Sequence, residues 1–135
     1  MDQSLEQWRP VVGYEGLYEV SDQGRVRSLP GIRWNGLKNH VFKGKILKPQ
    51  GTARYLHVVL SKDGKTKTYR IHALVASIFL ADCPGIRGRH RGQYHIDHIN
   101  NNPRDNRASN LQWLIHRDNT YVKANRKRNS EGQFV

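Results

Sequence analysis

Two consecutive residues, Asp63 and Gly64, constrain the fold of this chain most strongly. They lie between two runs of β-type residues, 55–61 and 66–71. Asp-Gly in a short connection favours the turn that joins antiparallel strands, because both positions tolerate a positive φ. The sequence therefore predicts a β-hairpin over residues 55–71.

A helix is expected directly after this hairpin, over residues 72–80. The apolar residues that share one face of this helix are Leu74, Val75, Ile78 and Phe79. Pro84 and Gly85 end the segment, and an arginine-rich loop follows at 82–93. His72, at the start of the helix, fits a DNA contact or a structural imidazole.

Short strands with tight turns are expected before the hairpin. They lie at 18–20 and 25–29 around a turn at Asp22–Gly24, and residues 30–53 are expected to form a loop followed by one short strand. Val26 between Arg25 and Arg27 gives a period of two, which places both arginines on one exposed face. That face suits phosphate contacts and suits an ordinary solvated strand equally.

The last third is expected to fold as strand, loop, strand and helix. The strands are expected at 94–99 and 110–115, the loop at 100–108, and a basic helix from His116 to about Arg126, with a frayed tail at 127–135. The fold class is therefore α+β, with short antiparallel strands and hairpins.

Positive charge is concentrated in the middle and the C-terminal part of the chain, whose formal net charge is +12. Residues 25–72 hold twelve basic and one acidic side chain, whereas residues 1–24 hold one basic and five acidic. This distribution indicates a polyanionic partner, although charge alone is also compatible with general solubility or with RNA binding. The candidate DNA-contacting residues are Arg25, Arg27, Lys43, Lys45, Arg87, Arg89, Arg91, Arg104 and Arg107.

Several classes of protein are excluded by composition. The single cysteine, Cys83, excludes a disulfide framework and a cysteine-built zinc site. The chain shows no long apolar run and no signal peptide, so we expect a cytoplasmic protein without membrane contact. Its 135 residues predict one domain or two small lobes with a thin core.

A histidine beside a carboxylate, followed by spaced asparagines, points to phosphodiester chemistry. Asp97-His98 is followed by Asn110 and, later, by Asn119. Carboxylate and amide oxygens bind a hard divalent cation, and an imidazole that is neutral near pH 7 accepts a proton from water. In so basic a chain, the natural phosphodiester is nucleic acid.

These motifs resemble the HNH endonucleases, in the form common among phage-borne and homing nucleases. The segment from Trp8 to Ser28 resembles the NUMOD4-like module that often precedes the nuclease core. The segment from Tyr69 through Asp97-His98 and the run 106–113 to Asn119 resembles the core itself. Both segments occur in the usual order, which is more specific than either alone.

The resemblance implies a ββα-metal (His-Me finger) core over about 94–126. In it, Asp97 and Asn119 would bind Mg²⁺ or Mn²⁺, His98 would be the general base, and Asn110 would brace the loop. We expect a backbone carbonyl to hold the second ring nitrogen of His98. The implied domains are a DNA-contacting module at 1–53, a nuclease core at 54–126 and a flexible tail at 127–135.

Some assignments stay open at this point. Asp118 competes with Asn119 as a ligand, but it projects about 100° away on a helix, so only one of the two fits. Asn110 is also compatible with merely closing a turn. His95 and His116 could bind a softer metal, but we expect both to support the site from outside it or to face DNA. Asn100-Asn101 replaces the usual Asp-Gly, a change that Asn tolerates because it can adopt a left-handed backbone.

The function that we expect is metal-dependent cleavage of double-stranded DNA by a monomer. The alternative is a non-catalytic DNA-binding protein, or an inhibitor of a host factor, built on the same scaffold. The Asp97-His98 pair argues against it, because a pure binder needs no base beside a carboxylate. An RNA-binding module would need an aromatic stacking platform, which three scattered tryptophans do not supply.

Overall fold

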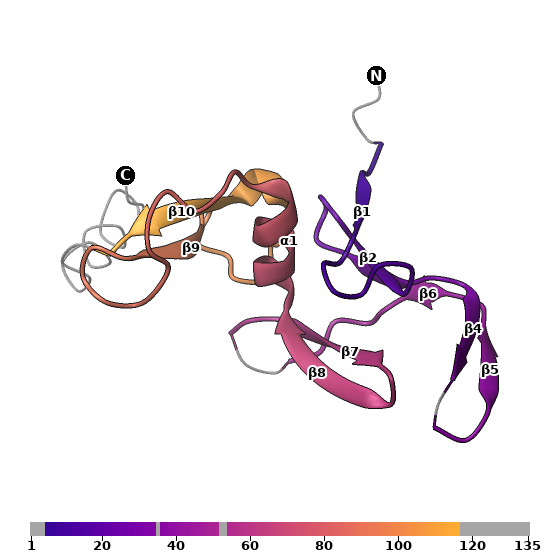
Figure 1. Ribbon diagram of the computed structural model, residues 1–135. Coiled ribbons are helices and arrows are strands. Elements are labelled where there is room, and N and C mark those ends of the chain that lie inside the picture. Colours follow the sequence, from indigo (N-terminus) through magenta and orange to yellow (C-terminus); the bar gives the residue numbers. More distant parts are fainter. Residues whose placement is uncertain (1–4, 35, 52–53, 117–135) are drawn as a thin grey trace. The chain divides into compact units, whose positions relative to one another are not determined.

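The computed structural model describes residues 5–34, 36–51 and 54–116 (Figure 1). The chain divides into two compact units, the first formed by residues 1–81 and 98–112 and the second by residues 82–97 and 113–135. The division falls between Asp97 and His98, so the two residues of the central motif belong to different units.

The N-terminal part of the first unit is a four-stranded antiparallel sheet in the order β1-β2-β3-β6. Its strands are β1 (Trp8–Pro10), β2 (Tyr18–Ser21), β3 (Val26–Ser28) and β6 (Lys45–Ile46). The turn expected at Asp22–Gly24 joins β2 to β3, and Gly24 has the positive φ of 85° that such a turn requires. The strands expected at 18–20 and 25–29 are confirmed.

A second hairpin lies between β3 and β6, where we expected only a loop. It consists of β4 (Gly31–Trp34) and β5 (Asn39–Phe42), with Ile32 opposite Val41. Ile32 and Val41 are both exposed, and no residue of β5 is fully buried, so β5 lacks the alternation of buried and exposed residues from which strands are recognised. The prediction of a plain loop at this place was wrong.

The hairpin at the Asp-Gly dipeptide is confirmed. Strands β7 (His57–Lys62) and β8 (Lys65–Arg70) pair antiparallel, with Lys62 opposite Lys65. Asp63 and Gly64 have φ values of 53° and 78°, the left-handed backbone that a two-residue connection favours. The helix α1 (Ile71–Phe79) follows without a break, as Figure 1 shows.

The C-terminal strands also lie where we expected them. Strand β9 (Tyr94–His98) and strand β10 (Leu111–Ile115) form a two-stranded sheet, and a short 3₁₀ helix, η1 (Ala108–Asn110), precedes β10. In the first unit, the Ile99 amide donates to the Asn110 carbonyl, and in the second the His116 amide donates to the Gln93 carbonyl. Of the helix expected from His116 to Arg126, all but His116 lies outside the described residues.

The apolar core belongs to the first unit. Its largest fully buried side chains come from strands β2, β3 and β7 and from α1, and they are Leu60, Ile71, Val20, Val26, Val58 and Val75. Hydroxyl groups connect the N-terminal segment to the hairpin: the Tyr14 and Tyr69 hydroxyls lie 3.1 Å apart, and the Ser61 amide donates to the Tyr18 hydroxyl. The N-terminal segment is thus part of the same core as the hairpin and α1.

The described residues are therefore mostly β with one α-helix, which agrees with the expected α+β class. Among them, no helix has the length and apolar character needed to span a membrane.

Candidate functional site

His98 ends β9 and is buried, with 7% of its surface exposed. Its Nε2 lies 2.8 Å from Oδ1 of Asn106, which is also buried. The Tyr55 ring stacks on the imidazole with centroids 6.0 Å apart, and the His72 ring meets it edge-on at 5.2 Å. The ring of His98 is therefore fixed on two sides by aromatic rings and at one nitrogen by an amide.

The contact with Asn106 determines which nitrogen of His98 carries the proton. An amide oxygen accepts hydrogen bonds and cannot donate them, so Nε2–H of the neutral ring is the donor. The other ring nitrogen, Nδ1, then holds the lone pair that can accept a proton. The backbone carbonyl that we expected at the second nitrogen is replaced by the Asn106 side chain.

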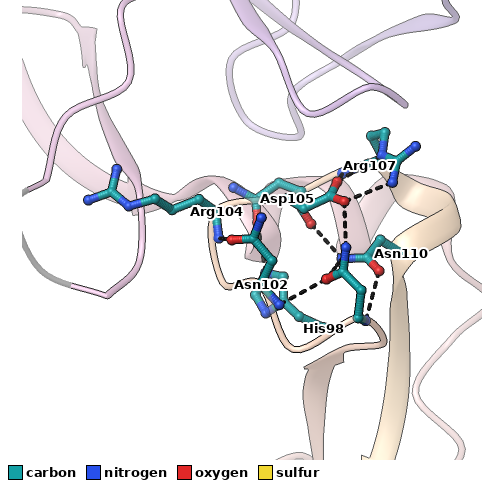
Figure 2. A network of polar contacts seen from close by, with 8 residues as sticks. His98, Asn102, Arg104, Asp105, Arg107 and Asn110 are labelled. Carbon is teal, nitrogen blue, oxygen red and sulfur yellow. Dashed lines mark hydrogen bonds and ion pairs between the residues drawn. The ribbon is translucent and has the colours of Figure 1, made fainter. Parts of the chain in front are cut away.

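Asn110 connects the two ends of the loop between β9 and β10 (Figure 2). Its Oδ1 accepts from the Asn100 amide at 3.1 Å, and its Nδ2 donates to Asn100 Oδ1 at 3.0 Å and to the Asp105 carbonyl at 2.9 Å. These three bonds link Asn110 to Asn100, near the start of the loop, and to Asp105, in its second half. These bonds go to residues of the loop, so Asn110 holds the shape of the loop.

The same loop contains an ion pair between Asp105 and Arg107, drawn in Figure 2. Arg107 Nη2 lies 2.7 Å from Asp105 Oδ2, and Asn100 Nδ2 donates to the same oxygen at 2.9 Å. The hydrogen bond from Arg107, assisted by that from Asn100, lowers the pKa of Asp105 to about 2. Asp105 is thus ionised at neutral pH and tied to the loop.

The asparagines at the start of the loop also form local hydrogen bonds. Asn100 Oδ1 accepts from the Asn102 amide at 2.9 Å, and Asn102 Oδ1 accepts from the Arg104 amide at 3.0 Å. Asn101 has a φ of 65°, so it adopts the left-handed backbone for which a glycine is usual. The substitution of Asn for Gly is therefore accommodated at this position.

Asp97 is the candidate metal ligand within the described residues. It is buried on β9 in the second unit, whereas Asn119 and its rival Asp118 lie outside the described residues. Across residues 5–34, 36–51 and 54–116, no three His, Cys, Asp or Glu side chains form a metal-binding group. A single carboxylate with one amide ligand suits Mg²⁺, which keeps several waters and needs only one or two carboxylates from the protein.

His95 and His116 lie together in the second unit, with ring centroids 3.9 Å apart. His116 is buried, and His95 is half-buried. His95 lies on β9 and His116 directly follows β10, so the two rings pack against each other at this sheet.

The candidate DNA-contacting residues fall into two groups by their partners. Arg25, Arg27 and Arg107 pair with Glu6, Glu19 and Asp105, and Arg27 also lies over the Trp8 ring at 4.0 Å. The second group comprises the remaining candidates, and all of them are exposed: Lys43, Lys45, Arg87, Arg89, Arg91 and Arg104. Within it, Arg87 lies over the Trp113 ring at 5.4 Å and Arg104 donates to the Gly51 carbonyl at 3.1 Å.

Three contacts of His98 were not assigned from the sequence, namely Asn106, Tyr55 and His72. Asn106 lies in the motif run 106–113, so its place was noted but its bond to His98 was not. Tyr55 lies far from His98 in the sequence, and no local pattern indicates that the two rings stack. His72 was left open between a DNA contact and a structural imidazole, and the structure shows it packed against His98 and Tyr55.

Comparison with family models gives two matches. Residues 6–61 match the NUMOD4 motif, and residues 86–121 match the HNH endonuclease family. The two matches follow each other in the order expected from the sequence.

Two similar proteins point to the same family. The chain is 33% identical over 114 residues to the DNA endonuclease I-HmuI of Bacillus phage SP01, a match that covers 84% of this chain and 55% of that protein. It is 26% identical over 116 residues to the uncharacterized HNH endonuclease L245 of Acanthamoeba polyphaga mimivirus, covering 85% of this chain and 29% of that protein. The chain thus spans about half the length of the first relative and less of the second.

A solved structure supports the likeness in three dimensions. It is described as DNA binding and cleavage by the HNH homing endonuclease I-HmuI, and it matches with a TM-score of 0.59 and 32% identity. The match covers 87% of this chain and 56% of that chain.

Proposed function

Because the chain belongs to the HNH endonucleases that carry an N-terminal NUMOD4 motif, we propose that it hydrolyses phosphodiester bonds of double-stranded DNA with the help of a divalent metal ion. The observation that carries this proposal is His98: a buried imidazole held at Nε2 by Asn106, with Nδ1 left as the proton acceptor. A general base needs a neutral imidazole with a free lone pair, and this hydrogen bond leaves that lone pair on Nδ1.

In this proposal His98 is the general base. Nδ1 takes a proton from the attacking water, and the bond from Nε2–H to Asn106 keeps the ring in the tautomer that can do so. The Tyr55 and His72 rings restrict the ring plane. Asn110 keeps the shape of the loop, through the three hydrogen bonds described above.

Asp97, together with Asn119, would hold the metal. When bound, Mg²⁺ or Mn²⁺ stabilises the negative charge that develops on the phosphate and on the leaving oxygen. Asp97 directly precedes His98 in the sequence.

The exposed basic residues would contact the phosphates of the DNA. A formal net charge of +12 favours a polyanionic substrate. The same proposal includes a monomer acting in the cytoplasm, which is the host's cytoplasm if a phage encodes the chain. A monomer suffices because one such site attacks one bond.

The proposal is tested by incubating supercoiled plasmid with the purified chain in Mg²⁺, in Mn²⁺ and in EDTA. We expect open-circular or linear DNA only with metal. We also expect His98→Ala to lower the rate by about 10²–10⁴-fold, the usual contribution of a general base, while DNA binding persists. The matched control is His90→Ala, an exposed histidine of the second unit, which should cleave as the unsubstituted chain does.

Three results would contradict the proposal. Cleavage that persists in EDTA would exclude the metal, and cleavage that is unchanged in His98→Ala would exclude this base. Binding without cleavage of a panel of DNA sequences would favour the non-catalytic alternative.

A further inference from the structure

We infer that the β2–β3 turn of the NUMOD4 segment positions His98 indirectly. The turn packs against the backbone of Asn106, and the side chain of Asn106 is hydrogen-bonded to His98. The inference rests on the proposed function, in which His98 is the base. It gives the N-terminal segment a part in the chemistry, beyond any contact with DNA. All the residues concerned belong to the first unit.

The first link is the bond between the Asn106 side chain and His98. Both residues are buried, with 5% and 7% of their surfaces exposed, so little water reaches this bond to replace it. A buried imidazole nitrogen that loses its partner is left unsatisfied, or the ring changes tautomer. The position of Asn106 therefore sets the tautomer and orientation of His98.

The second link is the contact between Asn106 and Gly24. A methyl group on Gly24 would lie 3.0 Å from the carbonyl carbon and oxygen of Asn106 and 3.1 Å from its Cβ. The turn thus lies directly against the backbone that carries the amide. Next to this contact, the Ala108 amide donates to the Asp22 carbonyl at 2.8 Å.

The turn is rigid enough to act as a support. The Ser21 hydroxyl, fully buried, accepts from the amides of Gln23 and Arg25 at 3.1 Å each. The Gly24 amide donates to the Ser21 carbonyl at 3.0 Å, and the Asp22 amide donates to the Gln7 carbonyl at 3.0 Å. A displacement of the Asn106 loop toward the turn is therefore resisted by a hydrogen-bonded structure.

The chain supplies a matched pair of glycines for a test. Gly24 and Gly16 have nearly the same φ, 85° and 82°, so alanine at either position carries a similar backbone cost. A methyl group on Gly16 would meet nothing within 4 Å. Of these two variants, only Gly24→Ala places a methyl group against the backbone of Asn106.

The first measurement uses the full-length, metal-free protein and needs no DNA. Imidazole nitrogens are recorded by ¹⁵N NMR at alkaline pH, and the His98 signals are assigned by their loss in His98→Ala. We expect the Nε2–H tautomer in the unsubstituted chain, a mixture of tautomers in Asn106→Leu, and recovery of Nε2–H in Asn106→Asp, which restores an acceptor oxygen. Gly24→Ala should shift the His98 signals, and Gly16→Ala should not.

The second measurement is the rate of plasmid cleavage. Asn106→Leu and Gly24→Ala should lower kcat by about 10–100-fold, the loss typical when the partner that orients a functional histidine is removed. KM should change little, because neither residue is among the basic side chains proposed to contact DNA. Gly16→Ala should keep the kcat of the unsubstituted chain.

A further variant covers the case in which Gly24→Ala unfolds. Ala108→Pro removes the amide that donates to Asp22, and the preceding residue, Arg107, already has the extended backbone (φ −64°, ψ 141°) that a following proline favours. It should also lower kcat and shift the His98 signals.

An Nδ1–H tautomer in the unsubstituted chain would overturn the inference. So would His98 signals that respond equally to Gly24→Ala and Gly16→Ala. If the tautomers behave as expected but no DNA is cleaved, the proposed function fails and the bracing of His98 stands.

Discussion

At the scale of single residues, the site depends on a histidine whose imidazole ring is held in one orientation. His98 is buried, bonded at Nε2 and flanked by two rings, so its orientation is fixed in advance, as the proposed role of general base requires. The sequence singled out His98 and Asn110 as candidates, because both occupy recognisable places in the motif. Asn106 was not identified as the partner of His98, because the bond depends on how the loop folds back.

The ion pair of the loop gives a prediction about acid. The pKa of Asp105 is about 2 in the folded chain against an ordinary 3.8, so the ionised carboxylate stabilises the fold above about pH 4. That stabilisation is lost as the pH falls from about 4 to about 2. We expect Asp105→Asn to lower the free energy of unfolding at pH 7 by at most about 1 kcal/mol, since Arg107 is half exposed and solvent screens the pair.

The measurement is urea unfolding of both proteins at a series of pH values. The difference between them should shrink as the pH falls through this window. A difference that is the same at pH 7 and at pH 2 would show that the charge of Asp105 contributes nothing.

At the scale of elements, strong local signals predicted the structure and weak ones did not. The β7–β8 hairpin and α1 followed from Asp-Gly and from an apolar helical face, signals that are complete within a few residues. The β4–β5 hairpin was missed because its strands are short and because its apolar pair, Ile32 and Val41, is exposed, so these residues give no core-facing pattern. The dipeptide Asn35-Gly36 was the available signal, since Asn-Gly favours hairpin turns.

The loop between β9 and β10 gives the prediction at this scale. Asn110→Ala removes three hydrogen bonds that close the loop, and each contributes on the order of 1 kcal/mol. We expect a loss of about 2–3 kcal/mol in the free energy of unfolding, measured with urea. Ser109→Ala, at the exposed neighbouring position, is the control and should change stability little. Equal stability of both variants would show that the loop does not depend on Asn110.

At the scale of the whole molecule, the sequence predicted basic character and an N-terminal segment followed by a core. What it could not show is that the N-terminal sheet shares its buried core with the hairpin and α1. The hydroxyl contacts of Tyr14 and Tyr18 with the hairpin join residues 43 or more positions apart, and such distant pairs leave no local pattern in a sequence.

Charge gives the prediction at this scale. If five to nine of the basic side chains contact phosphates, log affinity for DNA should fall with log salt with a slope of about −4 to −8. Arg89→Ala with Arg91→Ala should reduce the magnitude of this slope by about 2. Lys65→Ala with Lys67→Ala removes the same charge from the exposed β8 strand, outside the proposed contacts, and should leave the slope unchanged. Equal effects of the two pairs would show that only net charge matters.

The central claim, that His98 supplies the base, is tested most directly by chemical rescue. His98→Gly leaves a space where the buried imidazole stood, and imidazole added to the solution can take its place. We predict that His98→Gly cleaves plasmid in Mg²⁺ far more slowly than the unsubstituted chain, and that added imidazole restores part of the rate as its concentration rises. A His98→Gly rate that is already normal, or one that stays low at every imidazole concentration while DNA binding is intact, would contradict the account.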